Sequence, residues 1–287
     1  MLTNNIKMFK DAQKKAYAIP AINTQGGNYD IIRAICRAAE DLHSPIILAH
    51  YVNTGAYSGN DWFVEVCKWI AKDISIPVSI HLDHGDSFEL CMEALKLGFT
   101  SLMIDGSAMP VAENARLTNK VIQAARAFDV PVEAEVGELL RIDETGKSLE
   151  NKNTADVEDV REFLSMCRPD TLALGIGNAH GYYSGKPDIK IEILEQVRQF
   201  SDIPFVLHGC SGMDDDTIRR AIKAGVCKIN FGTHIRYKYV EYMKEGIENL
   251  NHNGHSWQIS RYASQKLEQD IKDIILLSGS EGKAKKL

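Results

Sequence analysis

The chain has 287 residues, of which 44% are hydrophobic and 25% charged, and its formal net charge is -6 at pH 7. This balance predicts a soluble globular protein with a large core, and it argues against a broad nucleic-acid surface, because such surfaces are strongly basic. Residues 1–10 lack the apolar core of a signal peptide and no run approaches membrane-spanning length, so no membrane partner is expected.

Apolar runs and amphipathic segments alternate along the first half of the chain, which predicts strands and helices in turn. Helices are expected over 3–15, 28–42, 60–73, 87–97 and 111–127, and strands over 17–22, 45–49, 76–80, 101–104 and 130–132. Each strand is followed at once by a polar residue of a type that binds ligands or transfers protons. In chain order these are Asn23, His50, the pair Asp83 and His84, Asp105, and the pair Glu133 and Glu135.

Residues 138–155 interrupt this alternation. They are mostly polar and show no sustained apolar period, which is typical of a mobile active-site loop or lid. Beyond them the alternation resumes, with helices over 156–166, 189–200 and 214–224 and strands over 171–176, 203–207 and 226–229. The later strands are followed by His180, His208 and Asn230, and helices fill the remainder.

Eight apolar runs, each followed by a helix, predict an α/β protein with the (β/α)₈ TIM barrel fold. We expect one barrel domain over residues 1–287, with the loop at 138–155 and additional C-terminal helices. The main alternative is an open doubly wound sheet, which normally carries a glycine-rich turn after its first strand. Residues 21–25 contain no glycine, so the barrel is favoured.

Three histidines at strand ends, His84, His180 and His208, are each followed by glycine. In a barrel the carboxyl ends of the strands converge, and three imidazoles from different strands are able to bind one Zn²⁺ and leave a position open for substrate. The alternative is that each histidine is a separate hydrogen-bonded residue. We favour the metal site, because glycine permits close approach of backbone and ligand.

Residues 209–212 and 230–233 follow the last two strands, where barrels commonly bind phosphate through backbone N–H groups and hydroxyls. Gly181 adds a further N–H group. Arg236 is expected either to meet a second phosphate or to be an exposed helix cation. The two loops together indicate a phosphorylated substrate.

The carboxylates separate into three groups. Asp83 adjoins a predicted ligand but faces the other way along its strand, so it is a candidate general acid or base. Asp105, Glu133 and Glu135 are candidates for orienting the histidines or for binding a second cation. In the loop, Asp143 and Glu144 are either a proton donor that closes over the substrate or a solvated charge pair.

Taken together, these motifs resemble the class II, zinc-dependent ketose-bisphosphate aldolases, which include the fructose- and tagatose-bisphosphate aldolases. The resemblance covers nearly the whole chain and rests on residues 17–23, 81–85, 101–107, 132–137, 179–181, 207–212 and 228–230.

The resemblance implies that His84, His180 and His208 bind zinc and that Asp83 is the catalytic acid or base. It also implies that a ketose (bis)phosphate is cleaved into dihydroxyacetone phosphate and an aldehyde through a zinc-stabilised ene-diolate, and that the subunits form dimers or tetramers. The residues implied to contact the substrate are Asn23, Gly181, Gly209, Ser211, Asn230 and Thr233.

Several departures from the family pattern favour a tagatose-type substrate over fructose 1,6-bisphosphate. Asp143 stands where the loop glutamate of the family is common, so that role passes to it or to Glu144. Residues 230–234 lack two aspartates of the fructose-specific members, and Ser184 replaces a lysine. His50 and Tyr51 are bulkier than usual, and we expect them near the substrate.

Two other functions remain open at this stage. A barrel metallohydrolase or epimerase would use the same three histidines, and a barrel with an altered loop would bind sugar phosphates without cleaving them. Whether a monovalent cation assists phosphate binding is also left open.

The six cysteines predict a reduced, cytoplasmic protein, because none forms a Cys-x-x-Cys pair and most lie in apolar runs. They are Cys36, Cys67, Cys91, Cys167, Cys210 and Cys227.

Overall fold

The strands of this protein close into a parallel barrel. The computed structural model describes residues 2–141, 154–183 and 185–284, and within them eight strands form a closed ring in the order β1-β10-β9-β7-β5-β4-β3-β2. They are β1 (Ile19–Asn23), β2 (Ile46–Tyr51), β3 (Val78–Gly85), β4 (Ser101–Ile104), β5 (Val132–Val136), β7 (Thr171–Leu174), β9 (Phe205–Leu207) and β10 (Val226–Phe231). The predicted (β/α)₈ barrel is therefore confirmed, and the open sheet is excluded.

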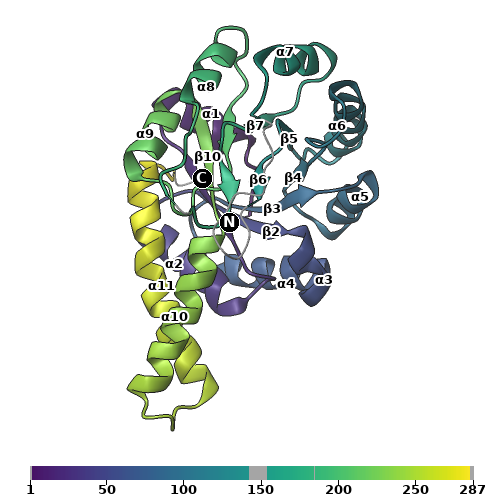
Figure 1. The fold of residues 1–287 in the computed structure, drawn as a ribbon. Helices are drawn as coiled ribbons and strands as arrows, with labels where there is room; N and C mark the ends of the chain where they lie inside the picture. Colours follow the sequence, from purple (N-terminus) through teal and green to yellow (C-terminus); the bar gives the residue numbers. More distant parts are fainter. Residues whose placement is uncertain (1, 142–153, 184, 285–287) are drawn as a thin grey trace.

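Helices follow the strands and cover the outside of the barrel (Figure 1). They are α1 (Ile6–Lys15), α2 (Tyr29–Asp41), α3 (Val52–Ser58), α4 (Asn60–Ile70), the 3-10 turn η1 (Ala71–Asp73), α5 (Phe88–Leu97), α6 (Val111–Arg126), α7 (Val157–Met166), α8 (Ile191–Arg198), α9 (Asp215–Lys223), α10 (Thr233–Asn249) and α11 (Ser256–Ser278). In the part of the chain that the structure describes, no helix is long and apolar enough to cross a membrane.

Helix α2 illustrates why these segments form and where they pack. The side chain of Asn28 accepts hydrogen bonds from the backbone N–H groups of Asp30 and Ile31, which satisfies donors that a helix start leaves open. Its apolar face, with Ile31 and Ile35, is buried against the outer face of the barrel. Each such side chain contributes about 1.5–3 kcal/mol when it leaves water.

Helix α1 closes the amino-terminal end of the barrel. Met8, Phe9 and Ala12 of this helix form one buried cluster with Ile19 and Ile47, which point into the barrel from β1 and β2. Because this end is filled with apolar side chains, substrate has access from the carboxyl end of the strands.

The strands β3 and β5 extend further than the apolar runs predicted. All eight residues of β3 are buried, including His81, Asp83 and His84, and Glu133 and Glu135 lie within β5. The expectation that these residues follow their strands is wrong. Polar groups that face the barrel interior interrupt the apolar run although the backbone remains in the sheet.

Three of the remaining elements, helix α3 and two short strands, were not expected from the sequence, whereas the C-terminal helices α10 and α11 were. Helix α3 follows β2 directly, in a segment with no helical periodicity. The short strands β6 (Leu140–Arg141) and β8 (Ala179–His180) pair in parallel outside the barrel, so the predicted loop contains a strand at its start. Helices α10 and α11 pack against each other, and their far ends extend well beyond the barrel (Figure 1).

Candidate functional site

A cavity of about 400 Å³ lies at the carboxyl end of the barrel strands. Its walls come from the ends of β1, β2, β3 and β10 and from the segments that follow β7 and β9. It brings together residues that the sequence singled out, namely Asn23, Asp83, His84, His180, Gly181, His208, Gly209, Ser211, Asn230, Thr233 and Arg236.

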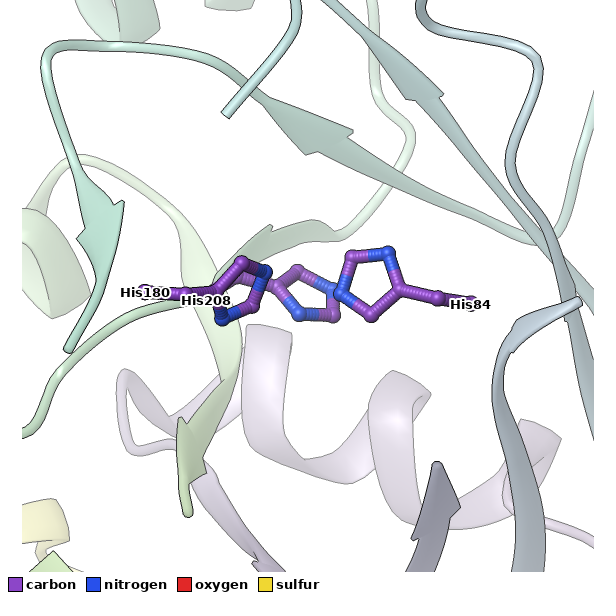
Figure 2. Close-up of side chains that lie close together, drawn as sticks. All are labelled: His84, His180 and His208. Carbon is purple, nitrogen blue, oxygen red and sulfur yellow. The ribbon is translucent and has the colours of Figure 1, made fainter. Parts of the chain in front are cut away.

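The three predicted ligand histidines face one another in this cavity (Figure 2). The ring centroids of His84 and His208 are 4.6 Å apart and those of His84 and His180 are 4.9 Å apart. One ring nitrogen of each lies within 4.8 Å of a ring nitrogen of the others. This spacing suits three ligands of a single ion.

His84 reaches the cavity through an unusual backbone conformation. His81 and Asp83 point into the barrel and Leu82 points out into the core, so simple alternation would send His84 outward. Its φ of +55° is left-handed, which costs a non-glycine residue about 1–2 kcal/mol. The expected opposite facing of Asp83 and His84 is therefore corrected: both line one cavity, because this left-handed residue turns the second side chain back.

Two glycines beside the histidines are required by close approach of the backbone. A Cβ at Gly85 would lie 2.5 Å from the carbonyl oxygen of Met103, and one at Gly209 would lie 2.2 Å from that of Ala179. Gly209 also has a φ of +67°. Any side chain at either position would displace a strand end that carries a histidine.

His84 is held by carboxylates behind it. Its Nδ1 lies 2.8 Å from Asp105 Oδ2 and 4.0 Å from Glu135 Oε2, and Asp105 is fixed in turn by the backbone N–H and hydroxyl of Ser107. Burial opposes protonation of His84, but the hydrogen bond to Asp105 and the nearby carboxylates outweigh it and raise its pKa to about 9. The same negative charge favours any cation in this place.

His208 is held through Nε2, whereas His84 is held through Nδ1. Its Nε2 lies 2.9 Å from Glu133 Oε1, deep in the barrel. Burial, together with the positive charge of His84 and Lys228, keeps the pKa of His208 well below its ordinary value. His208 is therefore a neutral imidazole, the form in which histidine binds metals.

The residues present fit a catalytic zinc ion. Among the described residues, His84 Nε2 and His208 Nδ1 are buried and have no hydrogen-bond partner, and these are the nitrogens that the carboxylates leave for the cavity. Buried polar atoms are seldom left unpaired, and two such nitrogens beside a third imidazole match the three-ligand, open-position set of catalytic zinc. A second candidate group, His84, Asp105 and Glu135, shares one of these ligands.

Asp83 lies beside this group. Its Oδ1 accepts a hydrogen bond of 3.2 Å from the amide of Asn230 and lies 4.0 Å from His208 Nδ1. The side chain is almost fully buried but lines the cavity. The carboxylate is thus oriented toward the space in which a substrate would lie.

The opposite wall of the cavity is built to receive an anion. Helix α10 begins there at Thr233, and the hydroxyl oxygen of Ser211 accepts a hydrogen bond from the backbone N–H of His234. The amino end of a helix offers N–H groups and a partial positive charge. Arg236, in the first turn of this helix, adds a full positive charge to the cavity wall.

Some expectations are not met or lie outside the described residues. The prediction that His50 lies near the substrate is wrong, because its ring is fully buried behind the barrel wall. It stacks on the ring of Phe63, with the two ring centroids 4.1 Å apart. Asp143, Glu144 and Ser184 lie outside the residues that the structure describes.

Other residues line the cavity without having been singled out. Gln25 donates a hydrogen bond to Asn23, and its place two residues after that strand end was the available signal. Thr54 comes from helix α3, which no periodicity announced. Tyr51 does line the cavity, as expected, and its ring stands edge-on to His84.

Comparisons with known proteins agree with this geometry. Residues 3–283 match the family model for class-II fructose-bisphosphate aldolase. The chain is 32% identical over 276 residues, 96% of each chain, to the D-tagatose-1,6-bisphosphate aldolase subunit GatY of Klebsiella oxytoca. Among solved structures, the YdjI aldolase of Escherichia coli K12 superposes with a TM-score of 0.87 at 29% identity, covering 99% of this chain and 100% of that chain. A putative fructose-1,6-bisphosphate aldolase from Coccidioides immitis superposes with a TM-score of 0.87 at 26% identity, covering 98% of both chains.

Proposed function

The chain belongs to the class-II fructose-bisphosphate aldolase family and is an aldolase, a lyase; from that premise we propose that it is zinc-dependent and cleaves tagatose 1,6-bisphosphate or a closely similar ketose phosphate. The observation that carries the zinc proposal is a pair of buried nitrogens, His84 Nε2 and His208 Nδ1, which have no partner within the described part of the chain and share one cavity with His180 and Asp83. Dihydroxyacetone phosphate and an aldehyde are the expected products.

In this proposal Asp83 is the base that starts cleavage. It takes the proton from the hydroxyl on carbon 4, the bond between carbons 3 and 4 breaks, and the aldehyde leaves while the electron pair stays on the dihydroxyacetone phosphate half. The amide of Asn230 holds Oδ1 of Asp83 and so orients the carboxylate for this transfer. A zinc ion bound by the three histidines would supply positive charge that stabilises the negative charge developing on the substrate oxygens.

Protonation of carbon 3 completes the reaction. We propose Asp143 or Glu144 as the donor, and both lie outside the residues that the structure describes. Lys228 is not suited to an alternative Schiff-base reaction. Its Nζ is fully buried, bonded to both oxygens of Glu133, and does not line the cavity.

The phosphate of the dihydroxyacetone half is proposed to bind at the amino end of α10. Gly181, Gly209, Ser211 and Thr233 line the same cavity, and the hydroxyl of Ser211 is bonded to the backbone at the start of α10. Backbone N–H groups with hydroxyls are the usual phosphate ligands of barrels. Asn23 and Asn230 are proposed to contact the hydroxyls of the sugar.

One observation favours a second candidate substrate, a ketose 1-phosphate without a second phosphate. Among the described residues that line the cavity, Arg236 is the one lysine or arginine. If it serves the phosphate at the start of α10, a second phosphate would lack a cationic partner there. Fructose 1,6-bisphosphate is the remaining alternative.

A panel of substrates distinguishes these possibilities. Tagatose 1,6-bisphosphate, fructose 1,6-bisphosphate and several ketose 1-phosphates are supplied to the zinc-loaded enzyme, and dihydroxyacetone phosphate is measured with a coupled dehydrogenase. We expect release from tagatose 1,6-bisphosphate with the highest kcat/KM. A higher kcat/KM for a monophosphate would select the second candidate. Formation of inorganic phosphate or of an epimer without any triose phosphate would instead identify a metallohydrolase or epimerase.

We also propose that the enzyme acts in the cytoplasm as a homodimer or homotetramer. All six cysteines are buried and unpaired, which suits a reducing compartment. Helices α10 and α11 expose the large side chains of Tyr237, Val240 and Trp257, which suits a contact with another subunit. A single monomeric species in sedimentation velocity at micromolar concentration would contradict the oligomer.

A further inference from the structure

A buried ion pair lies directly below the metal-binding histidines, in the interior of the barrel. Lys228 Nζ donates hydrogen bonds to Glu133 Oε1 at 2.9 Å and Oε2 at 2.7 Å, and Glu133 Oε1 also lies 2.9 Å from His208 Nε2. Lys228, Glu133 and His208 are each at most 2% exposed. Neither Lys228 nor Glu133 lines the cavity, so the mechanism proposed above leaves them without a part.

The chain of hydrogen bonds continues to the closed end of the barrel. The third bond of Lys228 Nζ reaches His81 Nε2 at 3.0 Å, His81 Nδ1 lies 2.7 Å from the hydroxyl of Ser101, and that hydroxyl accepts from the amide of Asn5 at 2.8 Å. Asn5 directly precedes α1. These hydrogen bonds therefore link His208 to helix α1, which closes the amino-terminal end of the barrel.

The chemistry of these groups fixes the direction of each hydrogen bond. An ammonium group only donates, so Glu133 accepts from Lys228 through both oxygens, and His81 accepts at Nε2. Glu133 Oε1 is then an acceptor for His208 as well, so the proton of this imidazole lies on Nε2. The nitrogen turned to the cavity, Nδ1, is left with its lone pair.

We propose that Lys228 is a positioning residue: through Glu133 it fixes the orientation and tautomer of His208, so that Nδ1 is presented to the metal. This inference rests on the proposed function, in which His208 is a metal ligand. Partners behind the ligands of a metal commonly fix ring orientation in this way. A contribution to stability alone does not explain the pair, because buried ion pairs are often replaceable by apolar residues without loss of stability.

The first experiment needs no substitution. Imidazole nitrogens of the full chain, labelled with ¹⁵N in histidine, are observed by NMR in the metal-free and the zinc-loaded protein. The signals of His208 are assigned by their loss in His208→Asn. We expect the Nε2–H form of His208 in both states. An Nδ1–H form, or a rapid mixture of the two forms, in the metal-free wild-type protein would overturn the proposal.

The second experiment removes the donor. Lys228→Met is expected to raise the dissociation constant for zinc about 10–100-fold in a chelator competition and to give His208 a mixed tautomer. Ser79→Ala is the matched control, because buried Ser79 lies on the same strand as His81 and its replacement removes a part-buried hydrogen bond to Thr100 without touching the Lys228–Glu133–His208 hydrogen bonds. It should leave both readouts unchanged.

A folded Lys228→Met protein, judged by circular dichroism, with a zinc affinity within twofold of wild type and an unchanged tautomer would refute the role of Lys228. If this variant fails to fold, the wild-type spectra still decide. Neither readout uses a substrate, so a failed aldolase assay, which would contradict the proposed function, is a separate result.

Discussion

Replacing Asp83 with alanine is expected to lower kcat for ketose phosphate cleavage by about 10²–10⁴-fold, the usual contribution of a positioned general base. Among the described residues that line the cavity, Asp83 is the one acidic group, and Asn230 orients its carboxylate. Because no ligand nitrogen is removed, bound zinc remains at the wild-type ratio. The measurement is single-turnover release of dihydroxyacetone phosphate, with zinc determined by mass spectrometry on the same sample.

Asp86→Ala is the control for this variant. Asp86 lies three residues further along the chain, is exposed, and does not line the cavity, so its replacement changes local charge by the same amount without touching the site. A kcat for Asp83→Ala within threefold of wild type would remove Asp83 from the mechanism. A loss of zinc in Asp83→Ala would move it from catalysis to metal binding.

The barrel was predictable because its evidence is periodic and repeated. Each strand is an apolar run closed by polar residues, and each helix has an apolar face, as Ile31 and Ile35 show in α2. Parallel strands joined by helices converge at their carboxyl ends. That geometry alone predicts that His84, His180 and His208 lie near one another, and their placement in one cavity agrees with it.

The features that the sequence did not predict are those that no periodic pattern of apolar and polar residues marks. Strand ends were misjudged at β3 and β5, since polar residues inside a barrel, such as His81 and Glu133, satisfy one another and keep the strand running. The left-handed backbone of His84 is set by tertiary contacts, and no residue pattern announces it. The sequence did not show which way His50 points, because successive side chains of a strand point alternately into the cavity and out into the core.

Between the site and the apolar cluster that closes the amino-terminal end, the interior of the barrel contains buried polar groups. Glu133 and Lys228 are buried behind the cavity wall and form an ion pair whose hydrogen-bonding groups are directed at His208 and His81. Polar groups buried in this way are tolerated when they are fully hydrogen-bonded. The ring of His208, a proposed metal ligand, is therefore held by a directional hydrogen bond, which fixes its orientation better than apolar packing does.

Removal of the metal is expected to abolish cleavage. Dialysis against EDTA should lower kcat by about three orders of magnitude or more, because a bound cation supplies several kcal/mol of transition-state stabilisation and each 1.36 kcal/mol is tenfold in rate. One equivalent of Zn²⁺ should restore it. The protein should remain folded throughout, since the barrel core is independent of the three histidines. Full activity with residual zinc below one ion per hundred chains would refute the zinc mechanism.

The variant His84→Asn tests the zinc dependence by removing one of the proposed ligands instead of the metal. Asparagine tolerates the left-handed backbone that His84 adopts, so this variant removes the imidazole without adding backbone strain. We expect it to bind zinc at least about tenfold more weakly and to gain no activity from added Zn²⁺. His252→Asn is the matched control: the substitution is the same, the φ of +59° is also left-handed, and the residue is exposed at the tip of the α10–α11 pair. Wild-type zinc content in His84→Asn would show that the ion is held elsewhere, whereas equal losses of zinc in both variants would trace the effect to the backbone rather than to the ligand.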